Sequence, residues 1–214
     1  MLAACHDAGK PCLCRAMGDD YAAYMEERGA RVGRLRSWIA AELGDAEAVT
    51  LEFGCGHGHF LAGYAAERPG EWCAGLDLRT RRIRLAEAKA RKRGLARVRF
   101  VKAEAMEFLE ALDGGPRVGR AFMLFPDPWP KKRHHKHRML QPAFLDRLAD
   151  RAGPGARLFF RTDHADNFAW ALEQVEAHPR WTALPDEPWP HESGTYFQEV
   201  TGGRYQSFTA QANK

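Results

Sequence analysis

One carboxylate, one tryptophan and a dense run of cations lie side by side in residues 125–138, which read FPDPWPKKRHHKHR. The prolines stop any helix or strand, and the apolar run 120–125 before them predicts a buried strand that ends there. Since a residue before proline is driven out of the right-handed helical region, we expect Asp127 and Trp129 in extended geometry. A carboxylate beside a stacking ring and phosphate-binding cations is suited to chemistry on a nucleobase. The alternative is a proline-rich loop with a solvated charge run.

The cations that open this run are Lys131, Lys132 and Arg133. We interpret them as contacts to a nucleic-acid backbone, because clustered cations bind phosphates without reading sequence. Trp129 is a candidate stacking plate for the target base. A tryptophan that packs beneath its own loop is the alternative, and the residues alone leave both open.

A second group of residues, VTLEFGCGHG at 49–58, predicts a strand, a glycine turn and the start of a helix. Its three alternating glycines are Gly54, Gly56 and Gly58. They let the backbone approach a ligand closely, and the helix start offers free N–H groups. A dinucleotide fingerprint needs its third glycine where this chain has His59. With Glu52 two residues ahead, the spacing fits the nucleoside loop of S-adenosylmethionine enzymes, which binds no pyrophosphate.

Two more carboxylates follow strand-like apolar runs. Asp77 ends the run 72–77, 19 residues after Gly58, close to the spacing at which α/β nucleotide folds place an acid on ribose hydroxyls. Glu104 follows the run 98–101, where it is expected to accept from an adenine amine; alternatively it is a helix N-terminal acid favoured by the dipole. Open α/β sheets bind ligands at the carboxyl ends of their strands, so we expect these acids at one edge.

The elements that position these residues alternate between strands and helices, which predicts an α/β fold with a mostly parallel central sheet flanked by helices. Residues 1–17 are expected to form a mobile arm, and 18–214 a single domain that opens with one or two helices over 18–43. The remaining expected elements are a parallel core from about 48, a helix that ends at Gly153-Pro154-Gly155, a strand at 157–161, a helix through 168–175, a proline-rich link and a strand at 205–209.

Residues 35–200 resemble the bacterial single-subunit tRNA (guanine-N7)-methyltransferases. The matching strings are LEFGCGHG at 51–58, GLD at 75–77, FPDPWPKKRH at 125–134, TD at 162–163 and, more loosely, TYFQ at 195–198. The resemblance implies a Rossmann-like class I methyltransferase fold, S-adenosyl-L-methionine as methyl donor and a guanosine in the tRNA variable loop as acceptor.

The resemblance also implies roles for individual residues. The cofactor pocket would contain Glu52, Asp77, Glu104 and Asp127. The target nucleoside would contact Lys131, Asp163 and the segment from Thr195 to Gln198. Three residues depart from the family pattern: Gln198 stands in place of a Glu, His135 in place of Asn or Glu, and Glu104 in place of Asp. An amide has only one acceptor oxygen, so guanine recognition is altered at Gln198 unless Glu199 takes its place.

The implied acceptor restricts the mechanism. Guanine N7 carries an in-plane lone pair and no proton, so methyl transfer is an in-line displacement that needs no general base. We therefore expect Asp127, the candidate catalytic residue, to position the guanine edge and balance the positive charge that reaches it. N7 lies in the deep, narrow major groove of A-form RNA, so the base has to lie in a loop or be splayed out.

Composition is consistent with a cytoplasmic RNA enzyme. The 214 residues carry a net charge of +4 and are 45% hydrophobic, enough for one core, and no segment has membrane-spanning length. Five cysteines without regular pairing indicate a reducing compartment. The group Cys5-His6, Cys12 and Cys14 lacks zinc-knuckle spacing, and methyl transfer needs no metal, so no metal is expected. The chain is expected to act as a monomer or homodimer.

The sequence alone leaves two further points open. The basic segment 79–93 predicts a helix whose charged face is either solvated or an RNA contact. Two rival functions also remain: a methyltransferase of the same fold that acts on another RNA site or a non-RNA substrate, and a non-catalytic RNA-binding module. Retention of Glu52, Asp77 and Asp127 disfavours the second.

Overall fold

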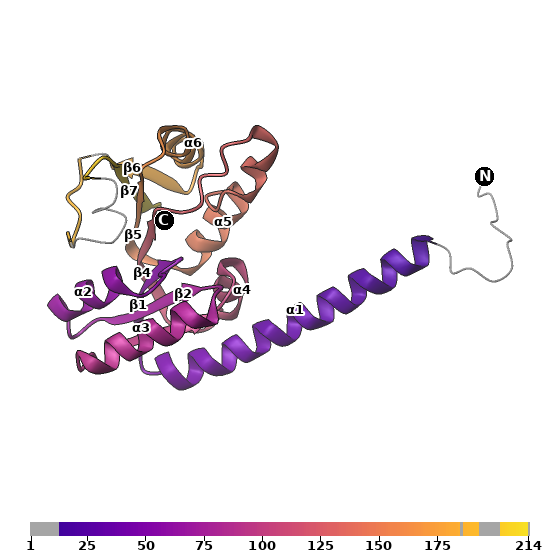
Figure 1. Cartoon of the computed structure of the whole chain (residues 1–214), viewed down its shortest axis with the longest axis horizontal. Helices are drawn as coiled ribbons and strands as arrows, with labels where there is room; N and C mark the ends of the chain where they lie inside the picture. Colours follow the sequence, from indigo (N-terminus) through magenta and orange to yellow (C-terminus); the bar gives the residue numbers. More distant parts are fainter. Residues whose placement is uncertain (1–12, 185, 193–201, 214) are drawn as a thin grey trace, which may run out of the picture.

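A seven-stranded sheet forms the centre of the protein in the computed structural model, which describes residues 13–184, 186–192 and 202–213 (Figure 1). Its order is β3-β2-β1-β4-β5-β7-β6. The five parallel strands are β1 (Ala48–Phe53), β2 (Trp72–Asp77), β3 (Val98–Lys102), β4 (Arg117–Leu124) and β5 (Ala152–Thr162). The other two, β6 (Trp181–Leu184) and β7 (Gln206–Ala212), pair antiparallel. The expected mostly parallel sheet is confirmed.

Helices cover both faces of this sheet. They are α1 (Leu13–Leu43), α2 (His59–Glu67), α3 (Thr80–Lys92), α4 (Ala105–Ala111), the 3₁₀ helix η1 (Lys132–His137), α5 (Pro142–Arg151) and α6 (Ala165–Glu176). One apolar cluster joins the sheet to α1, α4, α5 and α6, and a second joins it to α2 and α3. The strands form because their side chains are buried on both faces, as in β1, where every residue after Ala48 is buried.

The site follows from the strand order. The chain runs from β1 to β2 and β3 on one side, then crosses back to β4 and β5 on the other side of β1. The order therefore reverses between β1 and β4, and the loops that leave their carboxyl ends diverge. In open α/β sheets this divergence forms the ligand-binding crevice.

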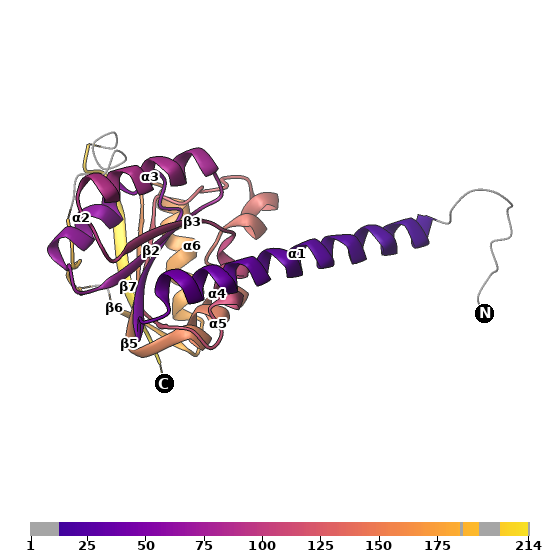
Figure 2. The same cartoon turned by 90° about the horizontal axis from the view of Figure 1, so that it is seen from below.

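The helix α1 extends well beyond the sheet. It begins at Leu13, inside the segment that we expected to be an arm, and continues as one helix to Leu43. Figures 1 and 2 show its first half projecting away from the domain. Its second half packs on the body, where Arg28 and Arg31 form ion pairs with acids of α4. Among the described residues, no helix is long and apolar enough to cross a membrane.

Three boundaries differ from the sequence expectations. The helix expected to end at Gly153-Pro154-Gly155 ends slightly earlier, at Arg151, and the strand expected from 157 starts at Ala152, so β5 includes these three residues. The strand expected at 205–209 is confirmed, although it runs from Gln206 to Ala212. The short edge strand β6 was not expected. Only its first residue, Trp181, is fully buried, so its hydrophobic pattern was weak.

Candidate active site at the carboxyl edge of the sheet

The glycine loop between β1 and α2 needs a backbone that only glycine adopts without strain. Gly54, Gly56 and Gly58 have φ angles of 74°, 53° and 66°. At Gly58 space is also restricted: an added Cβ would lie 2.7 Å from the Phe100 ring and 2.8 Å from the Ala86 Cβ. A side chain there would force α2 away from α3. The glycines therefore fix the loop that leaves β1.

Asp77 holds this loop in place from the end of β2. Its carboxylate accepts from the backbone N–H of Gly56 at 3.2 Å and of Arg79 at 2.8 Å, and from the guanidinium of Arg82 at 3.2 Å. The side chain is buried. An ionised carboxylate has about four acceptor positions, so these three bonds leave capacity for a further donor such as a ribose hydroxyl.

Glu52 provides a second buried carboxyl group, on β1. Burial raises the pKa of Glu52 to about 8, the negative charge of Asp77 adds to the rise, and a backbone N–H donated by Leu61 opposes it. Its Oε2 atom is buried and has no hydrogen-bond partner in the described structure. A buried acceptor without a partner is costly, so the position fits a ligand that brings a donor or a positive charge.

Glu52 opens into a cavity of about 370 Å³ at the carboxyl edge. The lining residues come from β1, the glycine loop, the first turns of α2 and α3, and the segment after β4: Glu52, Gly54, Cys55, Gly56, His57, His59, Phe60, Arg82, Phe125 and Asp127. The volume falls in the range of small-molecule sites, and the cavity lies where the strand order reverses. A nucleoside cofactor that bears a positive charge fits this cavity. The glycine loop can lie against it, the Glu52 oxygen lacks a partner among the described residues, and Asp77 adds a carboxylate from β2.

The structure brings together most, but not all, of the residues expected to bind a cofactor. Glu52, Gly54, Gly56 and Asp127 line the cavity, and Asp77 lies behind the glycine loop. Glu104 is not among the lining residues. It forms the N-cap of α4, where its carboxylate accepts from the backbone N–H of Glu107 at 2.9 Å. The helix N-terminal interpretation of Glu104 is confirmed, and a contact to adenine stays a prediction.

The segment after β4 turns sharply at two residues that precede prolines. Phe125 and Trp129 have φ angles of 49° and 45°, so the extended geometry expected for Trp129 is wrong. The proline ring excludes the right-handed helical region but leaves the left-handed one open. Such a conformation costs about 1–3 kcal/mol at a bulky residue and persists where the surroundings impose it. The Phe125 N–H donates to the Arg161 carbonyl on β5 at 2.7 Å, which fixes the first turn and places the exposed Asp127 at the cavity wall.

Trp129 packs against histidines of its own loop. Its ring centroid lies 5.8 Å from that of His134 and 5.0 Å from that of His137, and the side chain is half-buried. Below it, the buried Arg138 donates to the Pro128 carbonyl at 2.9 Å. Arg138 braces the loop from inside, a role that the sequence did not indicate. Stacking of Trp129 on a base therefore stays a prediction.

Three exposed cations, Lys131, Lys132 and Arg133, lie at the start of the basic run, and a fourth, Lys136, follows in η1. In the described part of the chain, none of them forms an ion pair with a carboxylate, and Arg133 donates only to the adjacent His134 ring at 3.2 Å. These cations are therefore available to an anionic partner next to the cavity.

Asp163 lies directly after β5, exposed, at the same edge as Asp127. Arg161, two residues earlier on β5, is almost fully buried. Nothing in the sequence indicated its structural role. Its guanidinium binds both carboxylate oxygens of Glu192 at 2.7 and 2.9 Å, and it lies 3.7 Å from the Trp189 ring centroid and 4.4 Å from that of Tyr205. The predicted substrate residues Thr195 and Gln198 lie outside the described residues.

Six further residues of the cavity wall were not predicted as site residues: Cys55, His57, His59, Phe60, Arg82 and Phe125. Arg82 had a usable signal, because it lies in the first turn of the helix after Asp77 and can reach back to it. The histidines had none beyond their place in the glycine loop. Among the described residues, no group of three or more His, Cys, Asp or Glu side chains is arranged to hold a metal ion.

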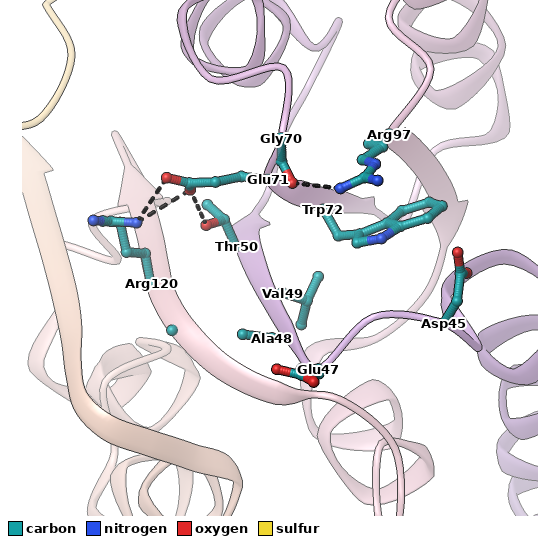
Figure 3. A pocket seen from close by; sticks show the side chains of 11 residues that line it. Asp45, Glu47, Ala48, Val49, Thr50, Gly70, Glu71, Trp72, Arg97 and Arg120 are labelled. Atoms are coloured by element: carbon teal, nitrogen blue, oxygen red, sulfur yellow. Dashed lines mark hydrogen bonds and ion pairs between the residues drawn. The ribbon is translucent and has the colours of Figure 1, made fainter.

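A second cavity, of about 520 Å³, lies at the opposite, amino edge of the strands (Figure 3). Its central carboxylate, Glu71, accepts from Tyr64 at 2.7 Å, from Thr50 at 3.2 Å and from Arg120 at 3.1 Å. Trp72 closes one side, with the Arg97 guanidinium 5.6 Å from its ring centroid. Glu71 is thus satisfied by its neighbours, and the other two lining acids, Asp45 and Glu47, are exposed to solvent. In the described structure none of these lining side chains has a buried polar atom without a partner, unlike Glu52 at the carboxyl edge.

Comparison with known proteins agrees with this geometry. A family model described as "Putative methyltransferase" matches residues 46–212. Two curated tRNA (guanine-N(7)-)-methyltransferases are similar to the chain. That of Halorhodospira halophila is 39% identical over 131 residues, 61% of this chain and 57% of its own length. That of Rhodospirillum rubrum is 33% identical over 166 residues, 77% of this chain and 63% of its own length. The chain thus spans about three fifths of each relative.

Solved structures show the same fold. The aminoglycoside resistance methyltransferase NpmB1 superimposes with a TM-score of 0.58 at 15% identity, over 83% of this chain and 93% of its own. At that identity the likeness concerns the fold alone. The family model, in contrast, spans the whole sheet and every described residue of the carboxyl-edge cavity, and on that basis the chain belongs to the methyltransferase family that the model describes.

Proposed function

We propose that the protein transfers a methyl group from S-adenosyl-L-methionine to N7 of a guanosine in the variable loop of tRNA. The observation that carries the proposal is the continuity of the segment after β4. Asp127 lies in the wall of the cofactor-sized cavity, and the unpaired cations Lys131, Lys132 and Arg133 follow it within six residues. Relatives at 33–39% identity are named for this activity.

The residues of the cavity fit the methyl donor. The glycine loop would lie against its nucleoside, Asp77 would accept from the ribose hydroxyls, and Glu52 would offer its free oxygen to a donor or positive charge. When bound, the donor supplies an electrophilic methyl group on a sulfonium sulfur. The partly enclosed cavity keeps this group in one place, which is the main requirement of an in-line displacement.

Asp127 would act on the acceptor base. N7 carries a lone pair and no proton, so no residue has to remove one. As the N7–carbon bond forms, positive charge moves to the guanine ring, and a carboxylate beside the ring stabilises that charge. The left-handed turns at Phe125 and Trp129 hold Asp127 in position before substrate arrives, so little reorganisation is needed.

The cations after Asp127 would hold the tRNA backbone. Phosphate contacts set the position of a nucleic acid without selecting a base. Selection would then depend on groups at the carboxyl edge, among them the exposed Asp163, which a purine edge can reach. A guanosine that is splayed out of its loop meets these groups together.

The test is to incubate the purified protein with unmodified tRNA and methyl-labelled S-adenosyl-L-methionine, then to digest the tRNA and identify the labelled nucleoside. We expect the label in 7-methylguanosine at one position of the variable loop. Label in another base points to the same fold with a different RNA substrate. Binding of tRNA without label points to a non-catalytic RNA-binding module.

A further inference from the structure

The outer surface of α3 carries a row of arginines that the proposed reaction does not use. Arg81, Arg84 and Arg91 are exposed, and their spacing of three and seven residues places them along one ridge of the helix, about 15 Å long. The only acid of α3 is Glu87. Within the described part of the chain, none of these three arginines forms an ion pair with a carboxylate.

Several half-buried arginines elsewhere are paired with acids, although other exposed ones, such as Arg36, also form no ion pair with a carboxylate in the described part of the chain. Arg28 lies 2.6 Å from Glu110, Arg157 lies 2.9 Å from Glu187, and Arg180 lies 2.7 Å from Asp150, each across different elements. On the ridge of α3 the one acid, Glu87, lies three residues after Arg84 and four before Arg91, yet it forms no ion pair with either in the described structure. A charged helix face that contacts only solvent usually carries both acidic and basic residues.

The position of Arg81 in α3 is also unfavourable for the stability of the helix. The N-cap is Arg79, so Arg81 and Arg82 occupy the first turn, and this turn contains no acid. The positive end of the helix dipole lies there and favours carboxylates over cations. Arg82 is compensated by Asp77 at 3.2 Å, whereas Arg81 is not. A ligand with negative charge would compensate it.

Positive charge accumulates along the helix. The pKa of Lys89 falls to about 8, first because the group is partly buried and then because Arg93 lies near it, and the charge of Glu52 opposes this fall.

The ridge begins at the wall of the candidate active site. Arg82, one residue from Arg81, lines the cavity and donates to Asp77. The ridge lies on the side of β2 and β3, whereas Lys131, Lys132 and Arg133 follow β4. Figure 1 shows α3 and the segment after β4 on different sides of the sheet. A polyanion that reaches the cavity can therefore contact cations on both sides of it.

We propose that Arg81, Arg84 and Arg91 form a second contact to the tRNA backbone, on the other side of the target guanosine from the cations after β4. This inference rests on the proposed function, because it takes tRNA as the substrate. The chemistry is phosphate recognition by guanidinium groups, which is independent of base sequence.

The test replaces the three arginines by glutamine and measures tRNA binding against salt concentration. A matched control, Arg36→Gln, Arg97→Gln and Arg117→Gln, removes the same charge from exposed positions away from the carboxyl edge. We expect the ridge variant to bind unmodified tRNA at least about tenfold more weakly at low salt and to flatten the slope of log affinity against log salt by about two. The control variant should keep the wild-type slope, and donor affinity should be unchanged in both.

Activity separates binding from folding. At subsaturating tRNA the ridge variant should methylate more slowly, and at saturating tRNA its rate should return to within about twofold of wild type. Its thermal midpoint should change little, because loss of Arg81 from the first turn of α3 favours the helix while loss of Arg91 from the last turn disfavours it. Equal salt slopes for the ridge and control variants would overturn the inference.

The outcomes also separate the two proposals. If the wild type forms 7-methylguanosine but the ridge variant keeps its salt slope, only the ridge inference fails. If the wild type binds tRNA through the ridge but labels a different base, only the proposed reaction fails. Absence of tRNA binding by the wild type overturns both.

Discussion

The two cavities at opposite edges of the same strands differ in the state of their central carboxyl groups. Glu71, at the amino edge, accepts from Tyr64 and, as Figure 3 shows, from Thr50 and Arg120. Glu52, at the carboxyl edge, is more deeply buried and keeps one oxygen without a partner among the described residues. The amino-edge cavity is the larger one, at about 520 Å³ against 370 Å³. Volume therefore does not mark the site, whereas a buried carboxyl oxygen without a partner does.

The largest effect that distinguishes the two edges is expected at Asp127. Replacement by asparagine keeps the shape but removes the charge that stabilises the methylated guanine. We expect the single-turnover rate with saturating tRNA to fall by about 10²–10³-fold, the size of effect seen when one preorganised electrostatic contact is lost. The affinity for tRNA should stay within a few-fold, because phosphate contacts supply most of it.

The pH profile of that rate tests the role of Asp127 independently. With no proton to remove, the wild-type rate should be nearly flat from neutral pH upward. A rate that climbs tenfold per pH unit across the neutral range would assign a general base and rule out N7 as the acceptor.

A smaller effect, on cofactor binding, is expected at Asp77. Alanine removes the acceptor of the Gly56 and Arg79 N–H groups and loosens the glycine loop. Hydrogen bonds to a charged group contribute about 1.5–3 kcal/mol each, so donor affinity should fall at least about tenfold. Calorimetric titration measures it, with tRNA affinity as the control that should not change. Unaltered donor affinity would exclude Asp77 from the site.

Glu52 is expected to make stability depend on pH in the absence of donor. Its folded pKa, about 8, lies above the ordinary value of 4.5, so the stability that its protonated form contributes is complete below about pH 4.5 and is lost as pH rises through 8. Between these values the free energy of unfolding should fall by up to about 1.4 kcal/mol per pH unit from this group alone. Denaturant unfolding of wild type and Glu52→Gln from pH 5 to 9 measures the difference. Parallel curves would mean that Glu52 is ionised in the folded protein.

The smallest effect is expected at the amino edge. Glu71→Gln weakens a half-exposed ion pair with Arg120 but keeps an acceptor for Tyr64. We expect a loss of about 1 kcal/mol in unfolding free energy and no change in the methylation rate. A tenfold loss of rate in a variant that stays folded would show that the amino-edge cavity takes part in function.

The sequence predicted the five parallel strands and the carboxylates near their ends because both depend on local patterns, whereas the edge strand β6 was missed. Glu52, Asp77 and Asp127 follow apolar runs, and parallel strands bring such positions to one edge. Long-range packing was not predictable in the same way. The burial of Arg161 depends on Glu192, 31 residues away, and no periodicity connects them. The left-handed turn at Trp129 was missed because the proline rule leaves two backbone regions open and packing decides between them.

Glu104 is a second residue whose contacts could not be predicted from the sequence. Its place after β3 resembles that of the other acids, yet its carboxylate caps α4. Local signals for a helix N-cap and for a ligand at a strand end are identical in sequence, since both put an acid directly before a helix. The observed hydrogen bond establishes the cap, and a contact to adenine stays a prediction.

The central claim is that the free carboxyl oxygen at the carboxyl edge marks the donor site. Calorimetric titration of S-adenosyl-L-methionine into the wild type, Glu52→Gln and Glu71→Gln tests it most directly. We predict one donor per chain for the wild type and for Glu71→Gln with equal affinity, and binding at least about tenfold weaker for Glu52→Gln. Equal binding by Glu52→Gln, or loss of binding in a folded Glu71→Gln variant, would contradict the account.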